Sequence, residues 1–263
     1  MRNNRNSRIC IKLKKISILF FSLLIFGCSS DEGATQSATE LYQEGQGAMK
    51  DNNCIAALRS FEALDSKYPF SPYKDQVQLD LMFCYYKSNN IQMALVTADR
   101  FLRLNPTHQE LDYVLYMRGL TNYLAKEDTF QALFGVDRAD RDIKFAESAF
   151  KDFQQLIVQY PNSEYVKDSQ LRLVSLKDYL ARHHLTIAKY YYSRDAFVAA
   201  ANRGQFILET YPETDSIQDA LLVMYLSYQN LKQPKLAEHV KEVYELNCGT
   251  VPKSMNWFAL KSK

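Results

Sequence analysis

The stretch Ala181–Pro212, ARHHLTIAKYYYSRDAFVAAANRGQFILETYP, decides the predicted fold. Its apolar residues recur at helical spacing in two runs, which the polar triplet Ser193–Asp195 separates. Ala188 and Ala200 are small, so two antiparallel helices could approach each other closely at these positions. Pro212 ends the second run, because proline lacks an N–H and disfavours helical dihedral angles in the residue before it. The stretch therefore predicts a hairpin of two α-helices.

The same pattern recurs at the offsets typical of tetratricopeptide (TPR) repeats. The three earlier copies contain Gly45, Ala57, Leu64 and Pro69; Met82, Ala94, Phe101 and Pro106; and Gly119, Ala149, Leu156 and Pro161. A fifth, degenerate copy covers Ala220–Gly249, with Ala237 in register. Gly204 departs from the pattern, which prefers a larger side chain at its position. One hairpin cannot bury both of its faces, so we predict an all-α TPR solenoid of about five repeats over residues 40–249.

The third repeat carries an insertion of eighteen residues, Leu124–Arg141, between Gly119 and Ala149. Acids and bases alternate along Asp137–Asp142, and apolar residues lie beside them. Charge runs of this kind are commonly solvated surface loops, but a loop with so much apolar surface usually docks on something. Docking on this chain and docking on a partner both remain open. In the second case the candidate partner contacts are Asp137, Arg138, Asp140 and Arg141.

The first 27 residues have the character of an export signal. Six basic residues and no acid lie within Met1–Lys15, and Ile16–Phe26 is apolar except for two serines. As a helix this run would rise about 16 Å, which is too short for a bilayer core of roughly 30 Å. It leads into Gly27-Cys28, which resembles the bacterial lipobox, so Cys28 is the candidate lipidation site. An ordinary secretory signal with a coincidental cysteine is the alternative.

Cleavage before Cys28 would leave a lipidated tether, residues 28–39, ahead of the repeats. Several acyl chains would make a stable membrane anchor. Serine at position 29, in place of aspartate, favours the periplasmic leaflet of the outer membrane by resemblance to enteric lipoproteins. Residues 250–263 are predicted to form a separate tail.

Processing also changes the charge of the protein. Loss of six basic residues from 32 Lys and Arg leaves 26 against 30 Asp and Glu, a net charge of −4. No basic face or arm survives, so no nucleic-acid partner is predicted. The cysteines that remain besides Cys28 are Cys54, Cys84 and Cys248. Their odd number and unrelated spacings argue against a disulfide framework, and Cys84 is expected to be a small buried hydrophobe.

Aromatic residues fall at first-helix positions that face the concave side of a TPR solenoid. These candidate substrate-groove residues are Tyr42, Phe83, Tyr86, Tyr113, Tyr116 and Tyr123. An extended segment rich in alternating aromatics would find apolar rings and hydroxyl partners there. Any single ring could instead pack between repeats. As a set they favour a peptide groove over a carboxylate clamp, which would need lysine, arginine and asparagine.

No catalytic, cofactor or metal site is predicted. His183 and His184 are the only adjacent histidines, and neighbours on a helix point about 100° apart, so they cannot chelate one metal together. The sequence has no nucleophile elbow, HExxH motif or phosphate-binding glycine loop. We therefore predict that the protein is not an enzyme.

Several stretches carry a further resemblance, and two of them, LDYVLYMRGLTNY (111–123) and FGVDRADRD (134–142), go beyond what repeat geometry demands. The stretches include LDSKYPFSPY (64–73), LDYVLYMRGLTNYLA (111–125), FGVDRADRD (134–142), YPNSEY (160–165) and AFVAAANR (196–203). With the lipobox, these stretches resemble the BamD family of outer-membrane protein assembly lipoproteins. The resemblance covers roughly residues 41–246 and includes the insertion, whereas the tail has no counterpart.

This resemblance implies a scaffold of the β-barrel assembly (BAM) complex, held on the inner face of the outer membrane. Its carboxy-terminal repeats would bind the POTRA domains of the barrel-inserting, BamA-type subunit, and its amino-terminal repeats would bind unfolded outer-membrane proteins. Arg203, in the matching Asn202-Arg203 pair, would contact the last POTRA domain. The residues alone leave a second role open for Arg203, an internal salt bridge with Glu209 or Asp195.

Two other functions share part of these features. Another periplasmic TPR adaptor lipoprotein in envelope organisation would have the anchor and the repeats but not FGVDRADRD. A small glycan-binding lipoprotein of the SusD kind also uses TPR helices, but those proteins carry a large non-repeat binding region.

Overall fold

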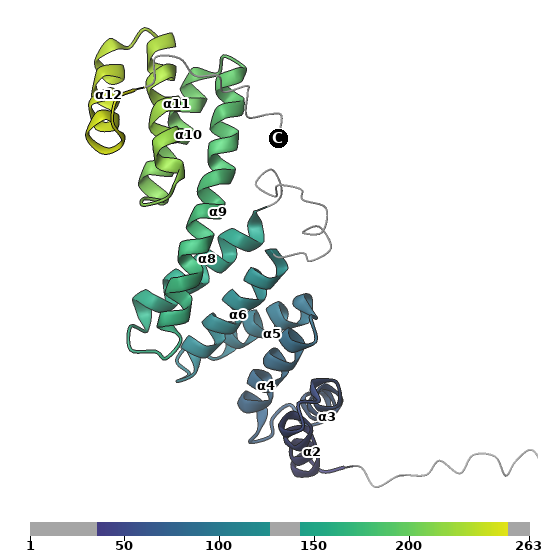
Figure 1. Cartoon of the computed structure of the whole chain (residues 1–263). Helices are drawn as coiled ribbons and strands as arrows, with labels where there is room; N and C mark the ends of the chain where they lie inside the picture. The colour runs from purple at the N-terminus through teal and green to yellow at the C-terminus, as the bar shows by residue number, and fades with distance from the viewer. Residues whose placement is uncertain (1–35, 127–142, 252–263) are drawn as a thin grey trace, which may run out of the picture. The chain divides into compact units, whose positions relative to one another are not determined.

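The computed structural model describes residues 36–126 and 143–251, and in these two ranges the chain forms helices and no strands (Figure 1). The helices are α2 (Ala38–Lys50), α3 (Cys54–Lys67), α4 (Lys74–Lys87), α5 (Ile91–Leu104), α6 (Leu111–Lys126), α8 (Lys144–Gln159), α9 (Val166–Ser193), α10 (Phe197–Thr210), α11 (Ser216–Asn230) and α12 (Pro234–Cys248). Of the described residues, 36–40 and those from Leu41 onward belong to separate compact units.

Within the first unit, Ser37 and Glu40 form a capping box at the start of α2. The Ser37 amide donates to Glu40 Oε2 at 2.7 Å, and the Glu40 amide donates to Ser37 Oγ at 3.3 Å. The two residues therefore satisfy each other's backbone N–H groups, which have no partner inside the helix.

From Leu41 onward, consecutive helices pair as hairpins. α4 packs on α5, α6 on α8, α9 on α10 and α11 on α12, and the second helix of each pair contacts the first helix of the next. One residue in each of four intra-pair turns has a left-handed backbone conformation, with φ between 55° and 60°; these are Asn52, Asn89, Asp195 and Lys232. The predicted all-α fold of stacked helical hairpins is confirmed.

Prolines end four helices, as predicted. The residue before each proline has left the helical region, with ψ between 55° and 60°; these residues are Tyr68, Asn105, Tyr160 and Tyr211. Their amides still donate to a carbonyl one turn back, so each helix closes its last turn before the chain leaves. The repeat register read from the prolines is therefore correct.

Small residues allow close helix contacts at the predicted positions. A Cβ on Gly45 would clash with Phe61 Cε1, and one on Gly119 would lie 2.7 Å from Phe153 Cε1. The spacing from Gly119 to Phe153 equals the spacing from Gly45 to Phe61 once the eighteen inserted residues are left out. At Gly204, a Cβ would lie 2.6 Å from a side-chain carbon of Met224 on α11. The next hairpin therefore occupies the space that a larger residue would need.

α9 is longer than the sequence indicated. The hairpin predicted from Ala181 begins earlier, because α9 runs without a break over 28 residues from Val166. Neither proline nor glycine interrupts residues 166–180, and Leu176 and Leu180 there are fully buried in the apolar cluster shared with α6 and α8. The first half of α9 thus covers the third repeat, and its second half belongs to the fourth.

Candidate functional site

The six predicted groove residues lie on α2, α4 and α6, and we call them the aromatic face. They are Tyr42, Phe83, Tyr86, Tyr113, Tyr116 and Tyr123, and all six are partly buried. Each packs against the apolar clusters beneath, yet part of each side chain stays accessible. α4 and α6 contact each other, so the rings on these two helices belong to one region.

Tyr165, the residue before α9, extends the aromatic face. Its ring stacks on Tyr116, with centroids 4.5 Å apart and planes 18° apart, and lies 5.8 Å from the ring of Tyr113. Burial raises the pKa of Tyr113, and it raises the pKa of Tyr165 to about 12, so both hydroxyls stay protonated donors near neutral pH. The repeat pattern gives Tyr165 no inward position, although the residue lies in the YPNSEY stretch.

An acid–base pair on α9 holds two of the rings. The Tyr116 hydroxyl donates to Asp168 Oδ2 at 2.8 Å, and Arg172 Nε donates to the same oxygen at 2.5 Å. The Arg172 guanidinium lies over the ring of Tyr123, 5.2 Å from its centroid. Burial alone would raise the pKa of Asp168, but hydrogen bonds from Arg172 and Tyr116 and the charge of Arg172 outweigh it and lower that pKa. The sequence missed this pair because the first half of α9 was not predicted.

At the other end of the face, Tyr42 stacks on Tyr73 with centroids 4.3 Å apart and planes 10° apart. Beside these rings, Asp80 on α4 accepts hydrogen bonds from Gln46 and Gln76. Asp80 is 7% exposed, and burial raises the pKa of its carboxyl group. Two amide donors therefore hold a buried acid between α2 and α4.

This combination suits an extended peptide. Partly exposed rings can bury apolar and aromatic side chains, and tyrosine hydroxyls can pair with the backbone groups of a segment that has no secondary structure. Arg172 offers further donors, since a guanidinium carries five N–H groups. The face thus has the chemical groups needed to hold an unfolded segment.

Arg203 on α10 contacts two rings. Its Nη1 donates to His184 Nδ1 at 3.0 Å, and its guanidinium lies 5.8 Å from the centroid of Phe206. The acids considered from the sequence do not engage it, and no ion pair within residues 36–126 and 143–251 includes Arg203. Glu209 instead accepts a hydrogen bond from Gln205 on its own helix. The internal salt bridge is therefore wrong for Arg203, while its contact to a POTRA domain stays a prediction.

His184 holds Arg203 as a neutral acceptor. A guanidinium can only donate, so Nδ1 accepts and the imidazole proton resides on Nε2. Burial, and then the charge of Arg203, lower the pKa of His184 to about 4. The ring is 5% exposed and stacks on Tyr211 at 5.6 Å, and Nε2 is buried without a hydrogen-bond partner among the described residues.

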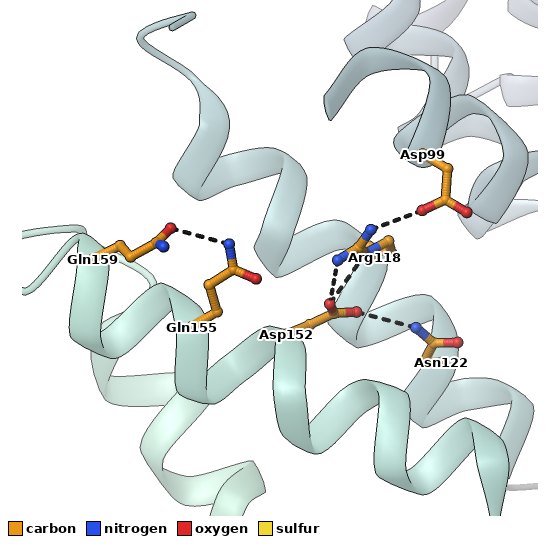
Figure 2. A network of polar contacts seen from close by, with 6 residues as sticks. All are labelled: Asp99, Arg118, Asn122, Asp152, Gln155 and Gln159. Atoms are coloured by element: carbon orange, nitrogen blue, oxygen red, sulfur yellow. Dashed lines mark hydrogen bonds and ion pairs between the residues drawn. The ribbon is translucent and has the colours of Figure 1, made fainter. Parts of the chain in front are cut away.

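A second polar cluster, which the sequence analysis did not single out, joins α5, α6 and α8 (Figure 2). Arg118 donates to Asp152 at 2.5 Å and to Asp99 at 2.7 Å, and Asn122 donates to Asp152 at 3.1 Å. Burial raises the pKa of Asp152, and the hydrogen bonds from Arg118 and Asn122 oppose that rise. The cluster lines a pocket of about 580 Å³. The buried carboxylate of Asp152 is paired with more than one donor. Through Arg118, the cluster links α5 of the second repeat to α6 and α8 of the third.

Other predicted site residues lie outside the described residues. These are Cys28 and the insertion residues Asp137, Arg138, Asp140 and Arg141. Their roles, and the division into signal peptide, tether and tail, stay predictions.

Across the described ranges, no helix has both the length and the apolar character needed to cross a membrane. The same ranges hold no group of three or more His, Cys, Asp or Glu side chains placed to bind a metal ion.

Comparison with known proteins gives consistent matches. The model of the YfiO family, described as outer membrane lipoprotein, matches residues 34–243. The outer membrane protein assembly factor BamD of Vibrio cholerae is 41% identical, over 90% of this chain and 99% of that protein. BamD of Pasteurella multocida is 39% identical, over 90% of this chain and 92% of that protein. A solved TPR protein from Parabacteroides merdae covers 82% of this chain and 80% of its own, but its 14% identity and TM-score of 0.37 are too low to support a comparison.

Proposed function

The chain belongs to the YfiO family of outer membrane lipoproteins, and we propose that it is a lipid-anchored scaffold of the outer-membrane β-barrel assembly (BAM) complex. The observation that carries this proposal is the 41% identity to the Vibrio cholerae assembly factor across 99% of that protein. This match covers nearly the whole length of the relative, so it includes stretches that repeat geometry does not demand as well as the generic TPR positions.

The protein acts by binding and not by catalysis. Stacked helical hairpins create extended surfaces on which partners can be held. The aromatic face lies on α2, α4 and α6, whereas Arg203 lies on α10, so different repeats would serve different partners. A scaffold of this kind brings a substrate and the barrel-inserting subunit together.

The aromatic face receives segments of unfolded outer-membrane proteins. Strands of membrane β-barrels alternate apolar and polar residues and carry aromatic residues near the membrane interfaces. Such a segment could place apolar side chains against the rings of Tyr113 and Tyr116, whose partners Tyr165 and Asp168 hold them in position. The contacts of the face are thus preorganised, which reduces the entropy lost on binding.

Arg203 contacts a POTRA domain of the barrel-inserting subunit. His184 uses one guanidinium N–H, so the other donors of the partly exposed side chain are available for a carboxylate. Because His184 is neutral, it orients Arg203 without cancelling its charge. A POTRA surface that presents an acidic residue would complete the contact.

The lipid anchor at Cys28 places the scaffold on the periplasmic face of the outer membrane. The lipobox supports this location, and so does the family description as an outer membrane lipoprotein. Attachment through acyl chains needs no membrane-spanning helix.

Affinity purification from solubilised outer membranes tests the proposal. The tagged, full-length protein should co-elute with the barrel-inserting subunit, while an unrelated tagged lipoprotein with the same type of anchor should not. Co-elution with envelope-organising proteins alone would assign the chain to another TPR adaptor class. Retention of a glycan without the barrel-inserting subunit would favour a SusD-like role.

A further inference from the structure

We propose that Cys54 and Cys84 form an intramolecular disulfide bond that joins α3 to α4. Cys54 is the first residue of α3, and Cys84 lies in the second half of α4. Their Sγ atoms are 2.9 Å apart, and the Cys84 thiol donates toward Cys54. A disulfide bond is about 2.05 Å long, so the sulfurs need to approach by only about 0.9 Å.

The surroundings favour this bond over other roles for two adjacent thiols. Cys84 is fully buried, and Cys54 packs partly buried against the same apolar cluster. Within the described residues the two sulfurs do not belong to any group of three or more metal-binding side chains. An S–H group is only a weak hydrogen-bond donor, so the thiol pair gains little from its contact. A disulfide is apolar and matches the apolar cluster against which both cysteines pack.

The oxidant is an external disulfide, R–S–S–R, carried by a thiol oxidoreductase or by glutathione. Cys54 is partly exposed, so its thiolate attacks first, forms a mixed disulfide and releases one R–SH after proton uptake. Cys84 then loses its proton, and its sulfur attacks Cys54 Sγ and displaces the second R–SH. Two protein thiols are oxidised, and one external disulfide is reduced to two thiols.

Burial raises the pKa of Cys84, so this second step is expected to be the slower one. The oxidant would be supplied by the periplasm, where disulfides form and persist. The inference rests on the proposed function only for this compartment and not for any binding partner.

The bond would join the second helix of the first hairpin to the first helix of the second hairpin. Closing the segment between Cys54 and Cys84 restricts the unfolded chain, and this stabilises the folded state. We expect the oxidised protein to melt about 5 °C or more above the reduced protein. Cys248, on α12, is a lone partly buried cysteine and supplies an internal control.

Thiol mapping on the full-length exported protein tests the proposal. Cells are quenched in acid, free thiols are alkylated, and disulfides are then reduced and alkylated with an isotopically heavy reagent. We expect the heavy label on Cys54 and Cys84, the light label on Cys248, and one cross-linked peptide in the unreduced digest. Light label on both Cys54 and Cys84, in the quenched sample and after incubation of the folded protein with oxidised glutathione, would overturn the proposal.

Two variants keep the test independent of folding defects. Cys54→Ser removes the more exposed partner, so reductant should no longer change its melting temperature and Cys84 should take the light label. Cys248→Ser should retain both the cross-linked peptide and the reductant-dependent shift. A reductant-dependent shift of equal size in Cys54→Ser and the wild type would contradict the proposed pairing.

Discussion

Arg203 Nη1 donates to Nδ1 of the buried His184 at 3.0 Å, so a charged side chain is oriented by a neutral one. An acid in the place of His184 would have formed a closed ion pair. A neutral acceptor leaves the charge of Arg203 uncompensated, which is the property that a contact with an external carboxylate requires.

Arg203→Glu should weaken binding to the POTRA region of the barrel-inserting subunit by about 2–5 kcal/mol, because two acids would then be brought together. A pull-down with wild type and variant measures this change, and circular dichroism checks the fold. Arg194→Glu, which changes an arginine that faces solvent after α9, is the matched control and should bind normally. Equal recovery with Arg203→Glu would remove Arg203 from the interface.

The low pKa of His184 predicts a loss of stability in acid. The unfolded histidine takes up a proton near pH 6.5, whereas the folded one resists protonation until about pH 4. Between these values the unfolded state binds more protons, so the free energy of unfolding falls as the pH falls, by about 3 kcal/mol in total. Urea unfolding at several pH values should show a shallower decline for His184→Gln. Identical declines in both proteins would show that His184 titrates normally.

Tyr113→Ala and Tyr116→Ala should each weaken capture of a barrel-terminal peptide by about 1–3 kcal/mol, since each removes a ring from the aromatic face. Fluorescence anisotropy with a labelled peptide measures the affinity. Tyr190→Ala is the control, because Tyr190 on α9 is 55% exposed and lies outside the face. Lost helicity in the Tyr113 or Tyr116 variants would make those rings structural, and unchanged affinity would exclude them from the binding surface.

The two acids around Arg118 should differ in their contribution to stability. The Asp152 side chain is 5% exposed and that of Asp99 is 56% exposed. Asp152→Ala leaves a largely buried arginine without its main partner and should cost about 3–5 kcal/mol. Asp99→Ala breaks an exposed pair and should cost less than about 1 kcal/mol. Chemical denaturation of both variants checks the difference, and equal costs would contradict it.

Cys28→Ala should abolish lipidation and release the protein from the membrane fraction. The reason is that the anchor depends on the thiol to which acyl chains attach. Metabolic labelling with a fatty-acid analogue, followed by membrane fractionation, measures both effects. Persistent label on the variant would defeat the assignment of Cys28, whereas Cys54→Ser should be labelled like the wild type.

Local signals in the sequence were sufficient to predict most of the fold. Pro69, Pro106, Pro161 and Pro212 end their helices where expected, because a proline acts on the residue directly before it. The length of α9 was missed because no local signal marks where one repeat ends inside a continuous helix.

Less of the candidate site than of the fold could be predicted from the sequence. The aromatic positions follow from repeat geometry, but their partners Asp168 and Arg172 lie on the unpredicted half of α9. The contact of Cys54 with Cys84 and that of His184 with Arg203 join different helices, so sequence spacing does not reveal them.

Conditional depletion of the protein tests the central claim most directly. The amount of folded, heat-modifiable β-barrel protein in the outer membrane is followed on gels as the protein is lost, with a periplasmic soluble protein as the control. The account predicts that folded barrels fall while the control stays constant, and that the wild-type chain restores them. Barrel levels that remain unchanged after complete depletion would contradict it.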